Sequence, residues 1–111
     1  MQKILYAIQQ KDAENYLQQQ LEKHDIISTG AVAYREAIVT SLREHPADIL
    51  LYRESLKGSI QTFELMQQLR MEFPTMRIVF MANEQPATSK LLSELVFLGI
   101  YDIINSNAPN I

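Results

Sequence analysis

The stretch ADILLYRESLKGS, residues 47–59, decides the fold class because it joins an apolar run to a turn that contains a glycine. The run Ile49 to Tyr52 is continuously apolar, which is typical of a strand covered on both faces of a parallel sheet. In open sheets of this kind, ligands bind at the edge where the strands end. The residue at that position is Arg53, a long cation. The role of Arg53 decides whether the chain is an enzyme, a switch or a binding module.

The composition is that of one globular domain. The chain has 111 residues, of which 47% are hydrophobic and 21% are charged, so it is long enough to bury its own core. The net charge of -3 and the scattered basic residues predict no nucleic-acid surface. The absence of cysteine excludes disulfides and thiolate zinc sites, and it favours the reducing cytoplasm. No apolar run is long enough for insertion into a membrane.

Further apolar runs alternate with helical patterns along the whole chain. The expected strands are Ile4 to Ile8, Asp25 to Val32, Ile49 to Tyr52, Arg77 to Met81 and Tyr101 to Ile104. This alternation predicts an α/β fold with a doubly wound, five-stranded parallel sheet in the order 2-1-3-4-5.

Four helices are expected between the strands. From the first helix to the fourth, the residues expected to face the core are Leu17 and Leu21; Tyr34, Ala37, Ile38 and Leu42; Ile60, Phe63, Met66 and Leu69; and Leu91, Leu92, Leu95 and Val96. Asp12 is expected to cap the first helix, and Pro46 to end the second. The last stretch, NSNAPNI, supplies no fifth helix to cover the first helix's side of the sheet, so this helix is expected to be absent or to lie outside the chain.

The alternation and the segment PADILLYRESLKGSIQTFELMQQLR, residues 46–70, together resemble the receiver domains of bacterial response regulators. HPADILLY matches the family's third strand, RIVFMA its fourth, and LLSELVFLGIYDII its fourth helix and fifth strand. The family's chemistry needs an acidic pair, an acceptor aspartate, a hydroxyl and a lysine. By the resemblance these positions fall on Ile8 and Gln9 (or Gln9 and Gln10), Arg53, Ala82, and Asn105 or Ser106. The resemblance therefore implies a degenerate phosphorylation pocket that binds no metal.

A narrower resemblance concerns the atypical receiver domain at the N-terminus of TadZ- and CpaE-type pilus-assembly ATPases, which are related to ParA and MinD. It is carried by the lost acidic pocket, the LKGS turn, FPTMRIVFMA, and LGIYDII before a linker. It implies a receiver-like domain over residues 1–105 and a linker beginning at 106–111 that leads to an ATPase domain. The domain is then a non-catalytic module for self-association, for instance as a homodimer, or for localisation through a pilus-assembly component.

A candidate protein interface lies on the fourth helix. Its polar stripe consists of Lys90, Ser93 and Glu94. Phe97 falls on the same stripe by helical spacing, and an aromatic residue on a solvated face often marks a contact surface. Because receivers commonly associate through the fourth helix and fifth strand, the resemblance adds Tyr101. The alternative is that the last turn of the helix bends inward and buries Phe97.

Arg53 has two further interpretations. It can pair with a neighbouring carboxylate, Glu54 or Asp12, while its stem lies along the sheet. It can instead bind a small anionic ligand together with backbone amides near Gly58 and Ser59, as in a flavodoxin-like protein. A receiver phosphorylated on another acceptor is the remaining alternative. The chain contains no P-loop, no GxGxxG fingerprint and no nucleophile arrangement, so neither enzyme activity nor a cofactor is expected.

Overall fold

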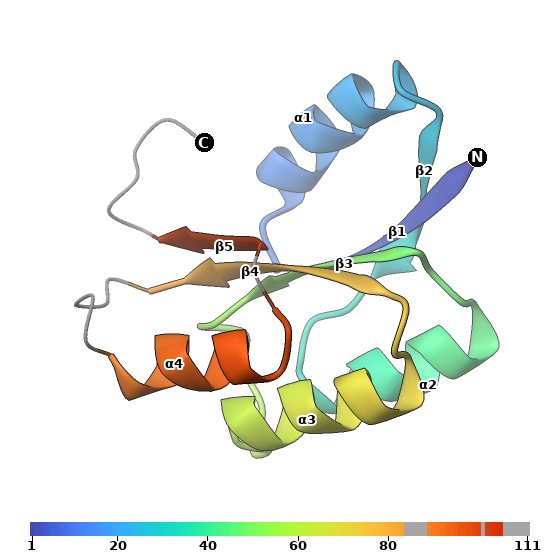
Figure 1. Cartoon of the computed structure of the whole chain (residues 1–111). Helices are drawn as coiled ribbons and strands as arrows, with labels where there is room; N and C mark the ends of the chain where they lie inside the picture. The colour runs from blue at the N-terminus through green and yellow to red at the C-terminus, as the bar shows by residue number, and fades with distance from the viewer. Residues whose placement is uncertain (84–88, 101, 106–111) are drawn as a thin grey trace.

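A computed structural model gives the structure of the chain, and it describes residues 1–83, 89–100 and 102–105. Strands and helices alternate (Figure 1). The strands are β1 (Gln2–Ala7), β2 (Ile26–Ala31), β3 (Ile49–Arg53), β4 (Arg77–Ala82) and β5 (Asp102–Asn105). The helices are α1 (Lys11–Glu22), α2 (Glu36–Glu44), α3 (Thr62–Glu72) and α4 (Lys90–Phe97). Within the described ranges, no helix has both the length and the apolar character needed to cross a membrane.

The strands form one parallel sheet of five strands in the order β2-β1-β3-β4-β5. This confirms the predicted doubly wound α/β fold with the third strand at the centre. Helix α1 covers one face of the sheet, whereas α2, α3 and α4 lie on the other face (Figure 1). The predicted linker at residues 106–111 lies outside the described residues.

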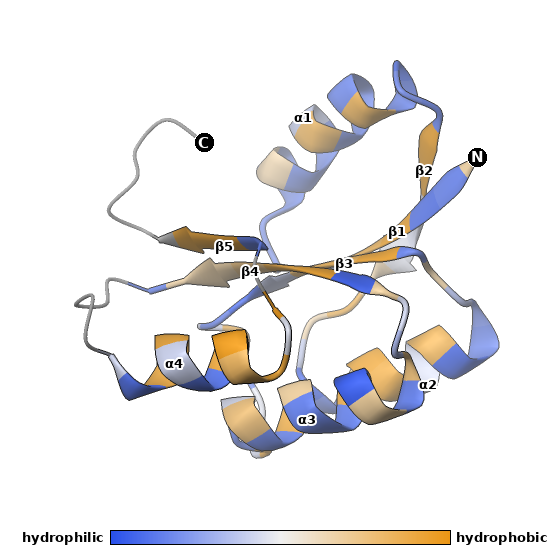
Figure 2. Ribbon diagram, viewed as in Figure 1, coloured by the Kyte–Doolittle hydropathy of each residue, from blue (hydrophilic) through white to orange (hydrophobic). Residues whose placement is uncertain are grey.

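Each face of the sheet has its own hydrophobic core, which explains the continuous apolar run in β3. Leu50 and Tyr52 belong to the larger core, which includes buried residues of α2, α3 and α4. Ile49 and Leu51 belong to the smaller core, against which α1 packs. Alternate residues of a strand point to opposite faces, so a strand between two cores must be apolar at every position. Figure 2 shows these hydrophobic strands between the two helical layers.

The start of α1 differs from the sequence prediction. The helix begins at Lys11, and its N-cap residue is Gln10, whose side chain makes no capping hydrogen bond. The predicted Asp12 cap is therefore wrong. Asp12 and Glu14 lie in the first turn instead, where negative charge complements the positive end of the helix dipole. The Glu14 carboxylate also accepts the backbone N–H of Gln10 at 3.3 Å.

Two residues predicted to face the core are exposed. Tyr34 precedes α2 rather than lying on it, and it is 56% exposed beside Lys57, with which it forms an isolated parallel bridge. Val96 on α4 is 51% exposed. The preceding residue, Leu95, is fully buried, and a helix turns by about 100° per residue, so Val96 is rotated away from the core.

Candidate functional site

The carboxyl ends of β3, β4 and β5 meet at one edge of the sheet. Arg53 ends β3, Ala82 ends β4 and Asn105 ends β5. Arg53 pairs with Met81, and Ala82 pairs with Asn105, so these three positions lie at the ends of neighbouring strands. Ala82 is buried and Arg53 is half-buried. Ser106 lies outside the described residues.

The residues after β1 differ sharply in their surroundings. Ile8 is fully buried in the smaller core together with Ile4 and Leu51. Gln9 is exposed and has a left-handed backbone conformation with φ of 51°. The chain therefore turns sharply between a core side chain and an exposed amide. Neither side chain can supply the negative oxygen ligands that a hard cation prefers.

Arg53 makes none of the ion pairs found among the described residues. Its Nε is shielded from solvent and has no hydrogen-bond partner in that part of the chain. The predicted pairing with Asp12 or Glu54 is therefore wrong. The Glu54 carboxylate instead accepts the backbone N–H of Asn83 at 2.8 Å, and the Glu54 N–H donates to the carbonyl of Met81 at 2.9 Å. Glu54 thus ties the end of β3 to the end of β4.

Metal-ligating residues do not gather in the described ranges, where no group of three or more His, Cys, Asp or Glu is placed to hold an ion. Both histidines, His24 and His45, are exposed near helix ends. The edge of the sheet therefore combines a cation, Arg53, with a buried methyl group, Ala82. Arg53 is not a carboxylate nucleophile, and the described residues do not gather a ligand set for magnesium.

Helix α4 presents the predicted stripe to solvent. Phe97 is 84% exposed, so the alternative in which the last turn buries it is wrong. Lys90 and Ser93 are exposed and Glu94 is half-buried. Val96 lies beside Phe97 in the sequence and adds further exposed apolar surface. Tyr101, the fifth predicted interface residue, lies outside the described residues.

Arg35, which the sequence analysis missed, holds the loop between β3 and α3. Its Nη2 donates to the carbonyl of Glu54 at 2.7 Å, its Nε to that of Leu56 at 2.9 Å, and its Nη1 to that of Ile60 at 2.8 Å. Its backbone N–H donates to the carbonyl of Lys57 at 2.7 Å. One side chain thus binds both the beginning and the end of the loop.

The next residue, Glu36, holds the same loop through its N–H groups. One carboxylate oxygen accepts the backbone N–H of Ser59 at 2.7 Å and that of Ile60 at 2.9 Å. The backbone N–H groups of Ile60, of Glu36 itself and of Ser59, together with the charge of Arg35, lower the pKa of Glu36. Gly58 lies so close that a Cβ added there would be 2.7 Å from the Arg35 Cβ. No periodic pattern links positions so far apart in the sequence, so only the structure reveals this contact.

Known proteins resemble the chain in structure rather than in sequence: no protein-family profile and no curated protein sequence matches it. RcsB from Salmonella enterica serovar Typhimurium, bound to a promoter in the presence of phosphomimetic BeF3-, is 18% identical with a TM-score of 0.78, over 95% of this chain and 59% of RcsB. The BeF3-activated N-terminal receiver domain of RstA from Klebsiella pneumoniae is 19% identical with a TM-score of 0.74, and the match covers 97% of this chain and 88% of the RstA chain. The signal receiver domain of a modulated diguanylate cyclase from Desulfovibrio desulfuricans is 18% identical with a TM-score of 0.75, and the match covers 96% of this chain and 82% of the cyclase chain. The chain has the receiver fold.

The receiver fold extends over nearly the whole chain, as the resemblance of residues 46–70 and the flanking motifs predicted. The chain spans 59% of one RcsB structure and 55% of another. The promoter binding described for RcsB is therefore a property of a longer protein. The narrower resemblance to TadZ and CpaE stays a prediction.

Beneath the edge of the receiver fold, Tyr52 carries a buried hydroxyl group. The residue is fully buried on β3, and no described residue bonds its hydroxyl with good geometry. Burial raises the pKa of Tyr52, and the nearby Arg35 guanidinium and Thr62 hydroxyl partly oppose this effect. The ring packs on Phe80 with the ring centroids 5.3 Å apart. Tyr52 is therefore a core residue with its polar end directed toward the Arg35 side of the larger core.

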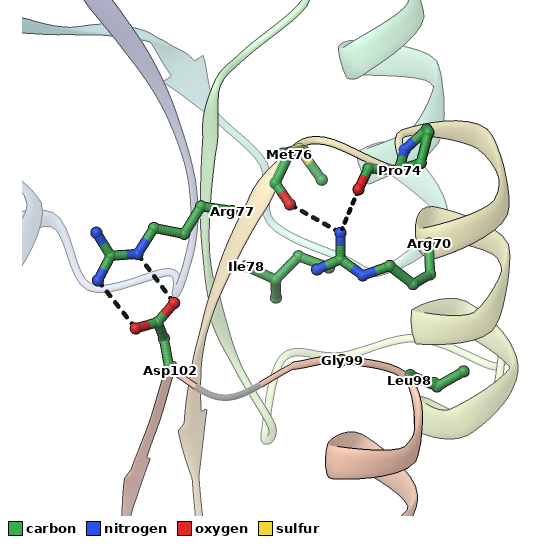
Figure 3. Close-up of a pocket in the computed structure, with 8 residues that line it drawn as sticks. All are labelled: Arg70, Pro74, Met76, Arg77, Ile78, Leu98, Gly99 and Asp102. Atoms are coloured by element: carbon green, nitrogen blue, oxygen red, sulfur yellow. Dashed lines mark hydrogen bonds and ion pairs between the residues drawn. The ribbon is translucent and has the colours of Figure 1, made fainter.

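A hollow of about 330 Å³ lies at the opposite, amino edge of the sheet (Figure 3). Arg70 donates from Nη1 to the carbonyls of Pro74 (3.2 Å) and Met76 (2.9 Å). Arg77 and Asp102 form a bidentate pair with both distances 2.9 Å. Figure 3 shows this pair on one side of β4 and Arg70 on the other. These charged groups stabilise the turn before β4 and the pairing of β4 with β5.

Proposed function

We propose that the chain is a receiver-like module that binds protein and performs no phosphoryl chemistry. The observation that carries the proposal is the exposure of Phe97, which is 84% exposed on the solvent face of α4. Aromatic residues are enriched at the centres of protein interfaces, where they bury a large apolar area at a low cost in conformational entropy. Lys90 and Ser93 on the same face provide the polar surroundings that such a contact needs.

The edge of the sheet supports the second half of the proposal. Phosphoryl transfer to a carboxylate requires the nucleophile itself and a metal ion that neutralises the developing charge. The acceptor position is occupied by Arg53, and the positions of the acidic pair are occupied by Ile8 and Gln9. A guanidinium is not the carboxylate nucleophile that this chemistry uses, and its charge opposes the binding of a cation. We therefore propose that the domain is neither phosphorylated nor catalytic.

The resemblance to the TadZ and CpaE type supports a narrower form of the proposal. The module then mediates self-association, or localisation of a ParA- or MinD-type ATPase in pilus assembly. Its partner is a second copy of this chain or a component of the assembly machinery. The sequence features behind this form are the lost acidic pocket, the LKGS turn and the motif FPTMRIVFMA.

Binding of a small anion at the strand ends is the second candidate. It is favoured by the shielded Nε of Arg53, which has no hydrogen-bond partner among the described residues. However, the amides that were expected to assist it are occupied, because Ser59 and Ile60 donate to Glu36. A thermal shift on addition of inorganic phosphate that disappears in Arg53→Met would support this candidate. The absence of any shift would leave protein binding as the proposed function.

Replacement of Phe97 by aspartate tests the proposal. Phe97→Asp should weaken association by about 2 kcal/mol, or roughly 30-fold in dissociation constant, because it places an unpaired charge in a desolvated contact. Its folding should change by only about 0.5 kcal/mol, since the side chain is exposed. Sedimentation velocity over a range of concentrations measures association of the wild type and the variant.

Tyr16→Asp is the matched control for this experiment. Tyr16 is an aromatic residue that is 62% exposed on α1, on the opposite face of the sheet. It should sediment like the wild type. Equal association of wild type and Phe97→Asp would refute a contact through α4. A loss of association only in Tyr16→Asp would assign the contact to the α1 side, where Leu17 and Leu21 would be tested next.

A further inference from the structure

Two consecutive residues at the start of α2 form hydrogen bonds through their side chains to the loop between β3 and α3, residues 54–61. Arg35 binds three of its carbonyls through the side chain, and Glu36 binds two of its N–H groups. Irregular backbone groups that leave water must find partners within the protein or in a ligand. Here the partners are internal.

The geometry of the guanidinium makes this loop conformation specific. Three carbonyl oxygens, those of Glu54, Leu56 and Ile60, converge on one planar group at 2.7 to 2.9 Å. Carbonyl dipoles that converge in this way repel one another unless donors lie between them, and the guanidinium supplies a separate nitrogen to each of the three carbonyls. Arg35 therefore selects one arrangement of the loop.

Glu36 does the same for the N–H groups at the end of the loop. Successive backbone N–H groups before a helix form a natural site for anions. At Ser59 and Ile60 that site is filled by a carboxylate of the same chain. An external anion would have to displace Glu36 before it could bind there.

We infer that Arg35 and Glu36 form an internal clamp that holds the β3–α3 loop in one conformation without a bound ligand. The clamp fixes Ile60, which precedes Gln61, the N-cap residue of α3, and α3 packs against α4. Through Glu54, whose carboxylate accepts the N–H of Asn83, it also holds the end of β4. The position of α4 is therefore the same with or without a phosphate analogue at the strand ends. This last consequence for the α4 surface rests on the proposed function.

Hydrogen exchange measured by mass spectrometry on the whole chain tests the clamp. Arg35→Met and Glu36→Ala should each increase exchange of the peptide that contains Ser59 and Ile60 by about tenfold or more, the effect of one lost charge-assisted hydrogen bond. Arg43→Met is the matched control, because Arg43 lies on the same helix and its guanidinium binds Glu72 rather than the loop. Addition of magnesium and beryllium fluoride should leave exchange of the wild-type loop unchanged.

Two results would overturn the clamp. The first is that the loop exchanges at nearly the same rate, within about twofold, in Arg35→Met, Glu36→Ala and the control Arg43→Met. The loss of one charge-assisted hydrogen bond should instead raise the exchange rate about tenfold. The other is clear protection of the wild-type loop by beryllium fluoride. If Arg35→Met fails to fold, Glu36→Ala gives the decision, because it removes an exposed carboxylate and leaves the arginine in place. Phe97→Asp should not affect exchange of the loop, so failure of the α4 contact and failure of the clamp are separate outcomes.

Discussion

Substitution of Gly58 by alanine should destabilise the protein through a specific collision. The position has a positive φ of 156°, which side chains rarely adopt. An added Cβ would lie 2.7 Å from the Cβ and 2.9 Å from the Cγ of Arg35, and 2.8 Å from an oxygen of Glu36. Neither neighbour can move without cost, because both bind the loop. The methyl group must therefore displace the loop or break these hydrogen bonds.

The expected size of the effect has two parts. The backbone conformation costs a residue with a side chain on the order of 1–3 kcal/mol. Overpacking against Arg35 and Glu36 adds about 1–3 kcal/mol. Gly30→Ala separates the two parts, because Gly30 has a similar φ of 141° and an added Cβ there meets nothing within 4 Å. Gly58→Ala should therefore be less stable than Gly30→Ala by about 1–3 kcal/mol.

Urea unfolding followed by circular dichroism measures both free energies of unfolding. The two variants should show the same dependence on urea as the wild type, so that the midpoints report stability. A difference between them of less than about 0.5 kcal/mol, the usual effect of a surface substitution, would refute the collision at Gly58. In that case the contact between the loop and Arg35 would be loose enough to accept a methyl group.

Three other outcomes follow from the structure. Incubation with acetyl phosphate and magnesium should leave the intact mass unchanged, because Arg53 replaces the acceptor, and a base-labile phosphorylated species would contradict this. Phe80→Ala should lower the free energy of unfolding by about 3–5 kcal/mol, because the side chain is fully buried against Tyr52; a loss below about 1 kcal/mol in urea unfolding would show that the core is less well packed there. The hydrogen bond from Arg77 lowers the pKa of Asp102, so the pair stabilises the fold above the ordinary carboxyl pKa of about 4 and loses this effect as pH falls through the lowered value. Because the pair is exposed, Asp102→Asn should cost less than about 1 kcal/mol at neutral pH and nothing once the carboxyl group is protonated, and a cost that persists in acid would rule out this linkage.

The sheet could be predicted from the sequence because a strand that is buried on both faces has a continuously apolar sequence. Ile49 to Tyr52 alternate between two cores, so every position is apolar, and the regular alternation of such runs with helical patterns identifies them as strands. Helical spacing placed Phe97 on the polar side of α4 with Lys90 and Ser93 but left open its burial by the last turn, and the structure shows that it is exposed. In both cases the information is local and periodic.

The failures arose where a contact joins distant segments or depends on where a helix begins. Glu54 was expected beside Arg53, but a backbone N–H from the end of β4 supplies a better-placed partner. Asp12 lost the capping role because α1 begins one residue before it. Arg35 showed no signal at all, since its partners are carbonyls, which every residue possesses. Sequence patterns record side-chain polarity and cannot indicate which backbone groups require a partner.

Two carboxylates at the carboxyl edge share one property that bears on function. Glu36 and Glu54 both direct their carboxylates to backbone N–H groups of the chain itself. A carboxylate used in this way is satisfied without a metal, and an N–H used in this way is satisfied without an anion. The edge therefore keeps its conformation through internal contacts that in a ligand-dependent protein would be made by the ligand. Under the proposed function, a ligand at the strand ends is therefore expected to change this edge little, whereas Phe97, which is 84% exposed, presents an aromatic side chain to a partner.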